Sequence, residues 1–587
     1  MRHFTQVCLA TFALVSLAAV VSSPAQVTSP APQAQPTTAL EGTYSGTLQA
    51  GEAQLHIVLH LSHSSSGELH ATLDSLENAV FAVEATSVSL DSGTLRFEIR
   101  SVGVSYEGRV SLDRQTIDGE WRQGSASLPL VFHHEAAAHK PENAKFPVEG
   151  LWQGALVANG LRLRLQLHVS HDSKGELIAA LDSLDQFVSG LPATKVTQTD
   201  NAFHFEIPSL AGTYDGALDL TRSIITGKWS QSDLTSNLEF KRSDEPLELL
   251  RPQNPAKPYP YRVEDVTFPN ARAGVTLAGT LTIPKGTGPF PAAILISGSG
   301  PQDRDGSIAN HKPFLIIADY LTRKGFAVLR YDKRGVGQST GTAETATTLD
   351  LASDVECAIT YLKSRKEIDP NKIGLIGHSE GAMIAPAIAA ANPAVPWVVL
   401  LAAPGTKGED TLLNQSDEIA RAGGLADAQV LASLNFDKQA YDLVEKETDS
   451  AAVSDKLKAL VKESGLDSAF PPSALDAQIH MMTSPWFRFY LTYDPIPDLK
   501  KTKCPVLALY GEKDLQIPPK INMPMLQKAF ADGGNTQADV RQLPELNHLF
   551  QHAYTGSPTE YAAIDETFSP QALQIISDWL LARNNVK

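Results

Sequence analysis

The chain has 587 residues, which is long enough for several domains. It carries 66 Asp and Glu residues against 49 Lys and Arg residues, and the formal charge of −17 argues against nucleic acid or an anionic membrane as a partner. Three cysteines without a C-x-x-C pair exclude a disulfide scaffold and a cysteine metal site. Neither a phosphate-binding loop nor an H-E-x-x-H motif is present, so we expect no cofactor and no metal.

The N-terminal segment has the pattern of an export signal. Residues 1–25 contain a basic start, an apolar run from Val7 to Val21, and Ser23-Pro-Ala25 before a cleavage site after Ala25. A membrane anchor is the alternative, but the run is short and includes polar residues. We therefore expect a periplasmic or secreted protein without a membrane span after cleavage. Residues 26–39 are rich in Pro, Thr, Gln and Ala and are predicted to form a flexible linker.

Two copies of one pattern follow, in residues 40–136 and 148–242. Gly42-Thr-Tyr-Ser-Gly46 matches Gly150-Leu-Trp-Gln-Gly154, and the matched motifs throughout lie 108 residues apart. A constant offset indicates a duplication without gaps. Polar and apolar residues alternate in both copies, which predicts antiparallel strands. We expect two duplicated all-β modules, each a sandwich or barrel of about seven or eight strands.

The sequence does not define the role of these modules. Trp121, Trp152 and Trp229 are candidates for ligand contact, including contact with a glycan or the cell envelope, but we expect them to pack in the core. A Pro-rich linker at 243–262 separates the modules from a C-terminal domain at 263–587.

The most informative motif lies in the C-terminal domain. Residues 372–385 are predicted to form an apolar strand, a turn with Gly377-His-Ser-Glu-Gly381, and an Ala-rich helix. This is the pattern of a nucleophile elbow, in which a sharp turn exposes the hydroxyl of Ser379. The backbone N–H of Glu380, at the start of the helix, would then face a developing oxyanion.

A serine nucleophile requires a base and a carboxylate that orients the base. Asp514 follows an apolar strand that begins near Cys504, and His548 follows the last strand, so both lie where the acid and the base are expected. His552 is an alternative base and Glu512 an alternative acid. His480 precedes the acid and lies in a predicted cap, so it is not favoured.

A second oxyanion donor is expected from the loop after an earlier strand. The segment 291–306 combines an apolar strand with a Gly-rich loop, and aligning Ser297-Gly298 with the usual His-Gly of such loops places the donor at Ser299, with a slip of one residue as the alternative. The run Gln302-Asp-Arg-Asp305 is either a polar rim of the site or a hydrogen-bonded loop clamp. Asp332 and Arg334 in the next loop are expected to be structural braces.

A long insertion separates two strands of this domain. The strand at 397–403 and the strand at 506–510 are about 100 residues apart, and much of the intervening sequence has helical periodicity. We expect a cap at about 405–495 that covers the site. The aromatic residues Trp486-Phe-Arg-Phe-Tyr490 and Tyr493 at its end either line an acyl pocket or pack the cap against the core.

From about Val263 to Val586 the chain resembles the α/β-hydrolases of the serine-hydrolase superfamily, and in particular EstD-type bacterial carboxylesterases, which are similar to the serine aminopeptidase branch. The resemblance implies a mostly parallel sheet with helices on both faces and a helical cap, and an activity on short- to medium-chain esters. The motifs that carry it are Gly298-Ser-Gly-Pro-Gln-Asp-Arg-Asp305, Arg330-Tyr-Asp-Lys-Arg-Gly-Val-Gly337, Gly377-His-Ser-Glu-Gly381, Gly511-Glu-Lys-Asp514 and Asn547-His548.

The sequence therefore predicts an exported serine carboxylesterase that acts on a small-molecule ester. Ser379, His548 and Asp514 would form the catalytic triad, and Ser299 and Glu380 the oxyanion hole. One alternative is an aminopeptidase in which Glu380 or Asp303 binds the substrate amine, and a thioesterase is another. A glycan- or envelope-binding protein with an inactive hydrolase domain is the alternative from a different class.

Overall fold

The computed structural model describes residues 40–584 except 51–52, 64–68, 76–79, 86, 92, 100–103, 112–113, 124–125, 136–145, 159–160, 173–174, 187, 222, 232–233, 244–250, 344 and 467–471. The predicted signal peptide and the linker at 26–39 lie outside the described residues. The described residues form two compact units, one with both β modules and the segment 559–565, the other with the rest of the chain from Arg251 onward. None of the helices described is both long and apolar enough to span a bilayer.

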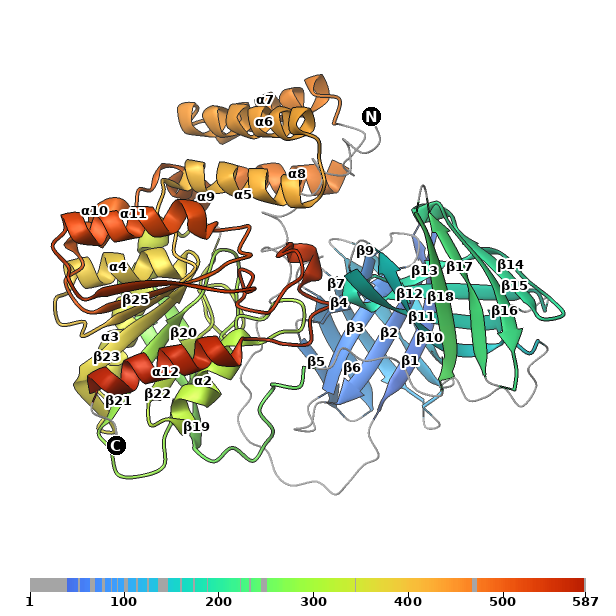
Figure 1. Cartoon of the computed structure of the whole chain (residues 1–587). Coiled ribbons are helices and arrows are strands. Elements are labelled where there is room, and N and C mark those ends of the chain that lie inside the picture. The colour runs from blue at the N-terminus through green and yellow to red at the C-terminus, as the bar shows by residue number, and fades with distance from the viewer. Residues whose placement is uncertain are drawn as a thin grey trace. The chain divides into compact units, whose positions relative to one another are not determined.

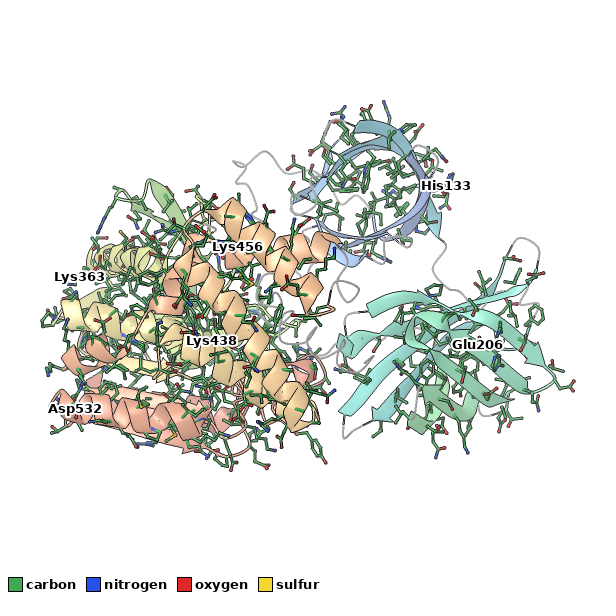
Figure 2. All side chains as sticks on the ribbon, turned by 90° about the horizontal axis from the view of Figure 1, so that it is seen from above. His133, Glu206, Lys363, Lys438, Lys456 and Asp532 are labelled. Atoms are coloured by element: carbon green, nitrogen blue, oxygen red, sulfur yellow. The ribbon has the colours of Figure 1, made fainter. Side chains whose placement is uncertain are left out.

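The first module is one antiparallel sheet with the strand order β4-β3-β2-β1-β9-β8-β7-β6-β5. Because β1 pairs with both β2 and β9, the meander curls back on itself, and Figure 2 shows this module as a ring of strands with side chains inside. Its strands are β1 (Gly42–Ala50), β2 (Ala53–His63), β3 (Leu69–Ser75), β4 (Val80–Glu84), β5 (Ser87–Asp91), β6 (Thr94–Ile99), β7 (Val104–Val110), β8 (Thr116–Gln123) and β9 (Ala126–Glu135).

The second module repeats this order, β13-β12-β11-β10-β18-β17-β16-β15-β14. Its strands are β10 (Gly150–Ala158), β11 (Leu161–His171), β12 (Leu177–Ser183), β13 (Val188–Pro192), β14 (Thr194–Thr199), β15 (Ala202–Ile207), β16 (Gly212–Asp219), β17 (Ile224–Gln231) and β18 (Leu234–Ser243). Both modules are all-β as predicted, but the described residues of each form nine strands rather than about seven or eight. The strands β4 and β5, at the two ends of the strand order, have five residues each, and β4, with the sequence VFAVE, does not alternate polar and apolar residues.

Inward-facing aromatic residues fill both modules. Tyr106 and its counterpart Tyr214 are buried, and each hydroxyl lies within hydrogen-bond distance of two strand carbonyls, for example Tyr106 at 3.0 Å from those of Ile117 and Leu130. Trp121, Trp152 and Trp229 are buried as well. Core packing of the three tryptophans is therefore confirmed, and their rings present no stacking surface to a sugar.

The C-terminal unit is built on an eight-stranded sheet with the order β19-β20-β22-β21-β23-β24-β25-β26. All neighbouring strands from β22 to β26 run parallel, and β20 runs antiparallel to both of its neighbours. The strands are β19 (Arg262–Asn270), β20 (Val275–Ile283), β21 (Phe290–Ile296), β22 (Ala327–Tyr331), β23 (Ile368–His378), β24 (Val398–Leu401), β25 (Val506–Gly511) and β26 (Ala538–Leu543). The α/β-hydrolase fold expected from the sequence resemblance is confirmed by this arrangement.

Helices cover both faces of this sheet, as Figure 1 shows. The helices α2 (Pro313–Arg323) and α12 (Pro570–Asn584) contact each other, and α3 (Thr348–Lys363), α4 (Gly381–Ala391), α10 (Ile496–Lys501) and α11 (Pro519–Asp532) form a second connected group. The central strands β22, β24 and β25 are buried along their whole length. Continuous apolar runs are the pattern of parallel strands that lie between two helical layers.

The predicted cap lies between β24 and β25. It consists of α5 (Gly408–Ala422), α6 (Asp427–Lys446), α7 (Ser450–Glu463), α8 (Pro472–Met482) and α9 (Pro485–Thr492). These helices share a hydrophobic core of their own, which includes Phe436, Tyr441, Phe487 and Leu491, and which reaches Met383 of α4. The cap is thus packed directly on the helix that begins at the elbow.

The chain before β19 is part of this unit from Arg251 onward. Arg251 donates to the carbonyl of Ala309, and Gln253 donates to the carbonyl of Phe568 at 2.7 Å. The second half of the Pro-rich segment 243–262 is therefore bound to the surface of the α/β domain.

Candidate active site

Ser379 lies in a strained turn between β23 and α4. Its φ angle of 55° is in the left-handed region, which a residue with a side chain seldom adopts. A Cβ atom at Gly377 would lie 2.1 Å from the carbonyl oxygen of Gly381, and one at Gly381 would lie 2.1 Å from that of Ile296. The two glycines therefore allow the backbone contacts that close the turn, and the predicted nucleophile elbow is present.

His548 and Asp514 form a buried pair. Nδ1 of His548 lies 2.9 Å from Oδ2 of Asp514. The other carboxylate oxygen accepts the backbone N–H groups of Gln516 and Ile517, at 2.9 and 2.8 Å. These two bonds fix the carboxylate, so the imidazole is held by Nδ1 and its Nε2 is the nitrogen available for proton transfer.

His378 connects this pair to the elbow. Its Nε2 lies 2.9 Å from the backbone carbonyl oxygen of His548, and the two rings lie 4.7 Å apart. Burial, together with the nearby imidazole of His548, lowers the pKa of His378 to about 3. His378 is therefore neutral near physiological pH, and its Nε2–H donates to the carbonyl. Since Ser379 is the next residue, the structure brings the elbow and the His548–Asp514 pair together.

The loop after β21 lies against the proposed nucleophile. A Cβ atom built on Gly298 would be 3.2 Å from Cβ of Ser379, so the backbone of the predicted oxyanion loop is adjacent to the serine. Lys333 donates from Nζ to the carbonyl of Gly298. The backbone N–H groups of Ser299 and Glu380 remain the predicted oxyanion donors.

The side chain of Glu380 is buried and accepts three hydrogen bonds. Its carboxylate accepts from Lys333 Nζ at 3.2 Å, Thr348 Oγ1 at 2.8 Å and Trp486 Nε1 at 2.7 Å. Asp303, the other candidate anchor for a substrate amine, accepts from the backbone N–H groups of Asp305 and Ser307 and from the Ser307 hydroxyl. Both carboxylates serve internal structure, so neither fits the role of amine anchor that an aminopeptidase requires.

The run from Gln302 to Asp305 is a loop clamp, one of its two predicted roles. The guanidinium of Arg304 forms two hydrogen bonds with the carboxylate of Asp332, at 3.1 and 2.7 Å, and Asp305 pairs with Arg330. Arg334 pairs in the same way with Asp354 of α3. The expected structural role of Asp332 and Arg334 is confirmed.

The alternative acid and base residues have other partners. His552 pairs with Glu566 at 2.7 Å, and its side chain is 51% exposed. Glu512 accepts the backbone N–H of Glu545. His480 lies on α8 in the cap. The geometry thus favours Asp514 and His548 over all three alternatives.

The aromatic residues at the end of the cap divide between the two predicted roles. Phe487 and Tyr490 are buried in the cap cluster, which is the packing role. Trp486 is only partly buried, and its indole N–H donates to the carboxylate of Glu380, the residue after Ser379. This link and the roles of Lys333 and His378 are not evident from the sequence, because each depends on a contact between distant segments.

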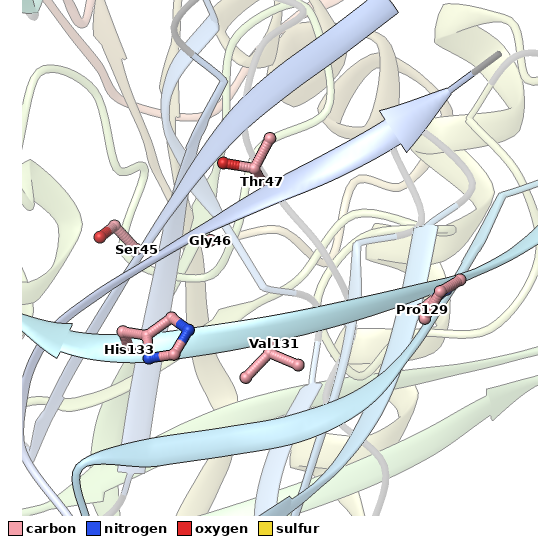
Figure 3. Close-up of a pocket in the computed structure, with 6 residues that line it drawn as sticks. All are labelled: Ser45, Gly46, Thr47, Pro129, Val131 and His133. Atoms are coloured by element: carbon pink, nitrogen blue, oxygen red, sulfur yellow. The ribbon is translucent and has the colours of Figure 1, made fainter.

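A separate hollow lies on the outer face of the first β module (Figure 3). It has a volume of about 430 Å³ and is lined by residues of β1 and β9 alone, namely Ser45, Gly46, Thr47, Pro129, Val131 and His133. A Cβ atom at Gly46 would lie 2.5 Å from the carbonyl oxygen of Val131, so the glycine allows the close approach of β1 and β9 at this point. None of these side chains is a carboxylate, a thiol or a permanent cation.

Parts of this chain are similar in sequence to known proteins. Residues 308–461 match the family model described as serine aminopeptidase, S33. Over 286 residues the chain is 31% identical to esterase EstD of Thermotoga maritima, a match that covers 49% of this chain and 61% of that protein. An uncharacterized Escherichia coli K12 protein, YfhR, is 34% identical over 126 residues, 21% of this chain and 40% of its own length. The chain thus spans less than two thirds of either curated relative.

Solved structures that are similar to this chain include two hydrolases. The α/β-hydrolase GrgF from Penicillium is 17% identical, with a TM-score of 0.35, over 55% of this chain and 99% of its own. The Pyrococcus furiosus esterase Pf2001 is 15% identical, with a TM-score of 0.34, over 58% and 99%. From the strand order, the turn at Ser379 and the sequence matches, the C-terminal unit has the α/β-hydrolase fold and is similar in sequence to EstD and to the serine aminopeptidase S33 family model, and two all-β modules precede it.

Proposed function

We propose that the C-terminal domain hydrolyses carboxylic esters by way of an acyl-enzyme, with Ser379 as nucleophile, His548 as base and Asp514 as the orienting acid. The observation that carries this proposal is the buried His548–Asp514 pair, 2.9 Å apart, beside a serine in a left-handed turn. The similarity to EstD, whose name is that of an esterase, supports the same class of substrate.

The mechanism follows from the roles of these groups. Nε2 of His548 takes the proton of the Ser379 hydroxyl as the oxygen attacks the ester carbonyl. The imidazolium that forms is stabilised by Asp514. Backbone N–H groups of Ser299 and Glu380 stabilise the oxyanion of the tetrahedral intermediate. His548 then protonates the leaving alcohol, and a water molecule activated by the same histidine hydrolyses the acyl-enzyme.

An ester substrate is favoured over a peptide with a free amino terminus. A peptidase of the aminopeptidase type needs a carboxylate that faces the substrate amine, and Glu380 and Asp303 are both bound internally. The direct test compares p-nitrophenyl esters from acetate to laurate with aminoacyl p-nitroanilides and an acyl thioester. Ester hydrolysis that exceeds anilide hydrolysis supports the proposal. Preference for the anilides would replace it with the peptidase, and preference for the thioester with a thioesterase.

We also propose that the protein is exported. The support is the N-terminal pattern of a basic start, an apolar run and the Ser23-Pro-Ala25 site. Expression of the full chain in a Gram-negative host, followed by mass spectrometry of the purified protein, tests this. A mature N-terminus at Gln26 in the periplasmic fraction is expected, and an intact N-terminus in the cytoplasm would refute export.

A further inference from the structure

A buried ion pair lies beneath the proposed oxyanion hole. The side chain of Lys333 is 6% exposed and that of Glu380 is fully buried, and Nζ lies 3.2 Å from Oε2. Buried ion pairs are costly unless their geometry and further hydrogen bonds offset the loss of hydration. This pair has such bonds, from Lys333 to the Gly298 carbonyl and from Thr348 and Trp486 to the Glu380 carboxylate.

The hydrogen bond to Gly298 has a consequence for Ser299. The carbonyl of Gly298 and the N–H of Ser299 belong to one peptide unit, which is planar and trans, so the two groups point in opposite directions. When Lys333 binds the carbonyl from one side, the N–H is directed to the other side. The backbone N–H of Lys333 also donates to the carbonyl of Gln302, at 3.1 Å, so the same residue holds the loop at two points.

The second proposed donor lies on the partner of this lysine. Glu380 supplies its own N–H at the start of α4, and its carboxylate holds the ammonium of Lys333. The positive charge also offsets the negative charge of Glu380, which would otherwise oppose an oxyanion nearby. One ion pair therefore links both donors, although Gly298, Lys333 and Glu380 come from three separate loops.

We propose that Lys333 and the side chain of Glu380 are positioning residues, which orient the N–H groups of Ser299 and Glu380 toward the oxyanion. This inference rests on the ester hydrolysis proposed above. The hydrogen bonds of the pair go to Gly298, Thr348 and Trp486, and the pair acts through the two backbone donors. Its contribution is therefore made in the transition state, and substrate binding in the ground state changes little.

The test uses the full chain with Lys333→Met and with the double variant Lys333→Met/Glu380→Gln, which leaves no unpaired charge. Lys372→Met is the matched control, because Lys372 also donates to a backbone carbonyl, that of Asn584, and lies in the N-terminal half of β23, away from Ser379. Active sites are titrated with a fluorophosphonate. Then kcat per titrated site, KM for p-nitrophenyl butyrate and the inhibition constant of an alkyl trifluoromethyl ketone are measured.

In both variants we expect kcat per titrated site to fall by about 10- to 100-fold, while KM changes by less than about threefold. The inhibition constant of the ketone, whose adduct carries an oxyanion, should rise by the same factor. The acid limb of the pH–rate profile should not move, because His548 is untouched. Unchanged kcat per titrated site with fewer titratable sites, or recovery of kcat in the double variant, would overturn the positioning role.

If the proposed ester hydrolysis itself is wrong, the same measurements give a different result. If wild-type protein neither hydrolyses the esters nor reacts with the fluorophosphonate at Ser379, the proposed function and the positioning role both fall. If wild type is labelled at Ser379 but does not hydrolyse these esters, only the ester proposal fails. The labelling rates of wild type and the two variants then decide the positioning role, with a reduction of about tenfold or more expected.

Discussion

Nδ1 of His548 lies 2.9 Å from Oδ2 of Asp514, and the second oxygen of the same carboxylate accepts two backbone N–H groups. The aspartate is thus fixed by the loop after β25, and the histidine is fixed by the aspartate. Because His378 donates to the backbone carbonyl of His548, the backbone of His548 is also linked to the residue that precedes Ser379. The proposed catalytic residues therefore lie in three connected loops at the carboxyl ends of β23, β25 and β26.

Asp514→Asn should abolish most activity without unfolding the protein. The amide preserves the shape of the side chain but no longer favours the Nδ1–H tautomer of His548 or the imidazolium, so we expect kcat to fall by about 10³- to 10⁴-fold. Glu512→Gln is the control, since Glu512 bonds only a loop N–H in this region, and it should stay within about threefold of wild type. Comparable losses in both variants, at equal melting temperature, would remove the assignment of Asp514.

Substitutions of the two histidines in the last loop, His548 and His552, should have very different effects on activity. His548→Gln is expected to lower kcat by about 10³-fold or more, because the proposed mechanism assigns the proton of the serine hydroxyl to Nε2 of His548. His552→Gln loses only a partly exposed pair with Glu566 and should retain activity. Steady-state kinetics on one ester suffice, and an inactive His552 variant with an active His548 variant would reverse the assignment.

Much of this site could be predicted because its parts are local in sequence. The glycines on either side of Ser379 indicate the elbow, and Asp514 and His548 each follow closely after a predicted strand. The presence of two similar β modules could be predicted in the same way, since strands such as β1 and β10, or β9 and β18, begin 108 residues apart. The predicted strand count was too low in part because β4, with the sequence VFAVE, lacks the alternation of polar and apolar residues.

The parts of the site that could not be predicted depend on contacts between segments that are distant in the sequence. Lys333 lies 47 residues from Glu380, and Trp486 lies 106 residues from it. A lysine in a glycine-rich loop and a glutamate beside a serine have the sequence pattern of exposed residues, and only the fold buries them together. The choice between loop clamp and polar rim for the run at Gln302 required the positions of Asp332 and Arg330 for the same reason.

Trp486→Phe tests whether the cap is tied to the elbow. Phenylalanine keeps an aromatic ring but removes the N–H that donates to Oε1 of Glu380 at 2.7 Å. We expect kcat/KM to fall by about three- to tenfold and the cap to become more accessible, because one buried acceptor loses a partner. Hydrogen exchange of α9 measures the second effect. Faster exchange in Phe487–Leu491 is predicted, and exchange equal to wild type would show that the bond does not hold the cap.

Asp437 should make the cap less stable as the pH rises. It is buried on α6, its Oδ2 has no hydrogen-bond partner among the described residues, and burial raises its pKa to about 7. The folded state therefore binds a proton that the unfolded state releases between about pH 4 and 7, and the stability contributed by this group declines across that window. Tyr441 and Ser416 are its polar neighbours.

Asp437→Asn removes this titration. Relative to wild type, its stability should improve from pH 4 to 7 and then level off, by an amount on the order of 3 kcal/mol. Thermal or urea unfolding of both proteins at pH 5, 6, 7 and 8 gives the difference at each pH, in which the contribution of His378 and other groups cancels. A difference that does not change with pH would show that Asp437 titrates normally.

The central claim is that Ser379 is the nucleophile of an esterase. The most direct measurement is the hydrolysis of p-nitrophenyl butyrate by the wild-type chain and by Ser379→Ala, with fluorophosphonate labelling and peptide mapping of the wild type. We predict that the variant loses activity by about 10³-fold or more at unchanged melting temperature and that the label is found on Ser379. Equal hydrolysis by the two proteins, or a label on another residue, would contradict the account.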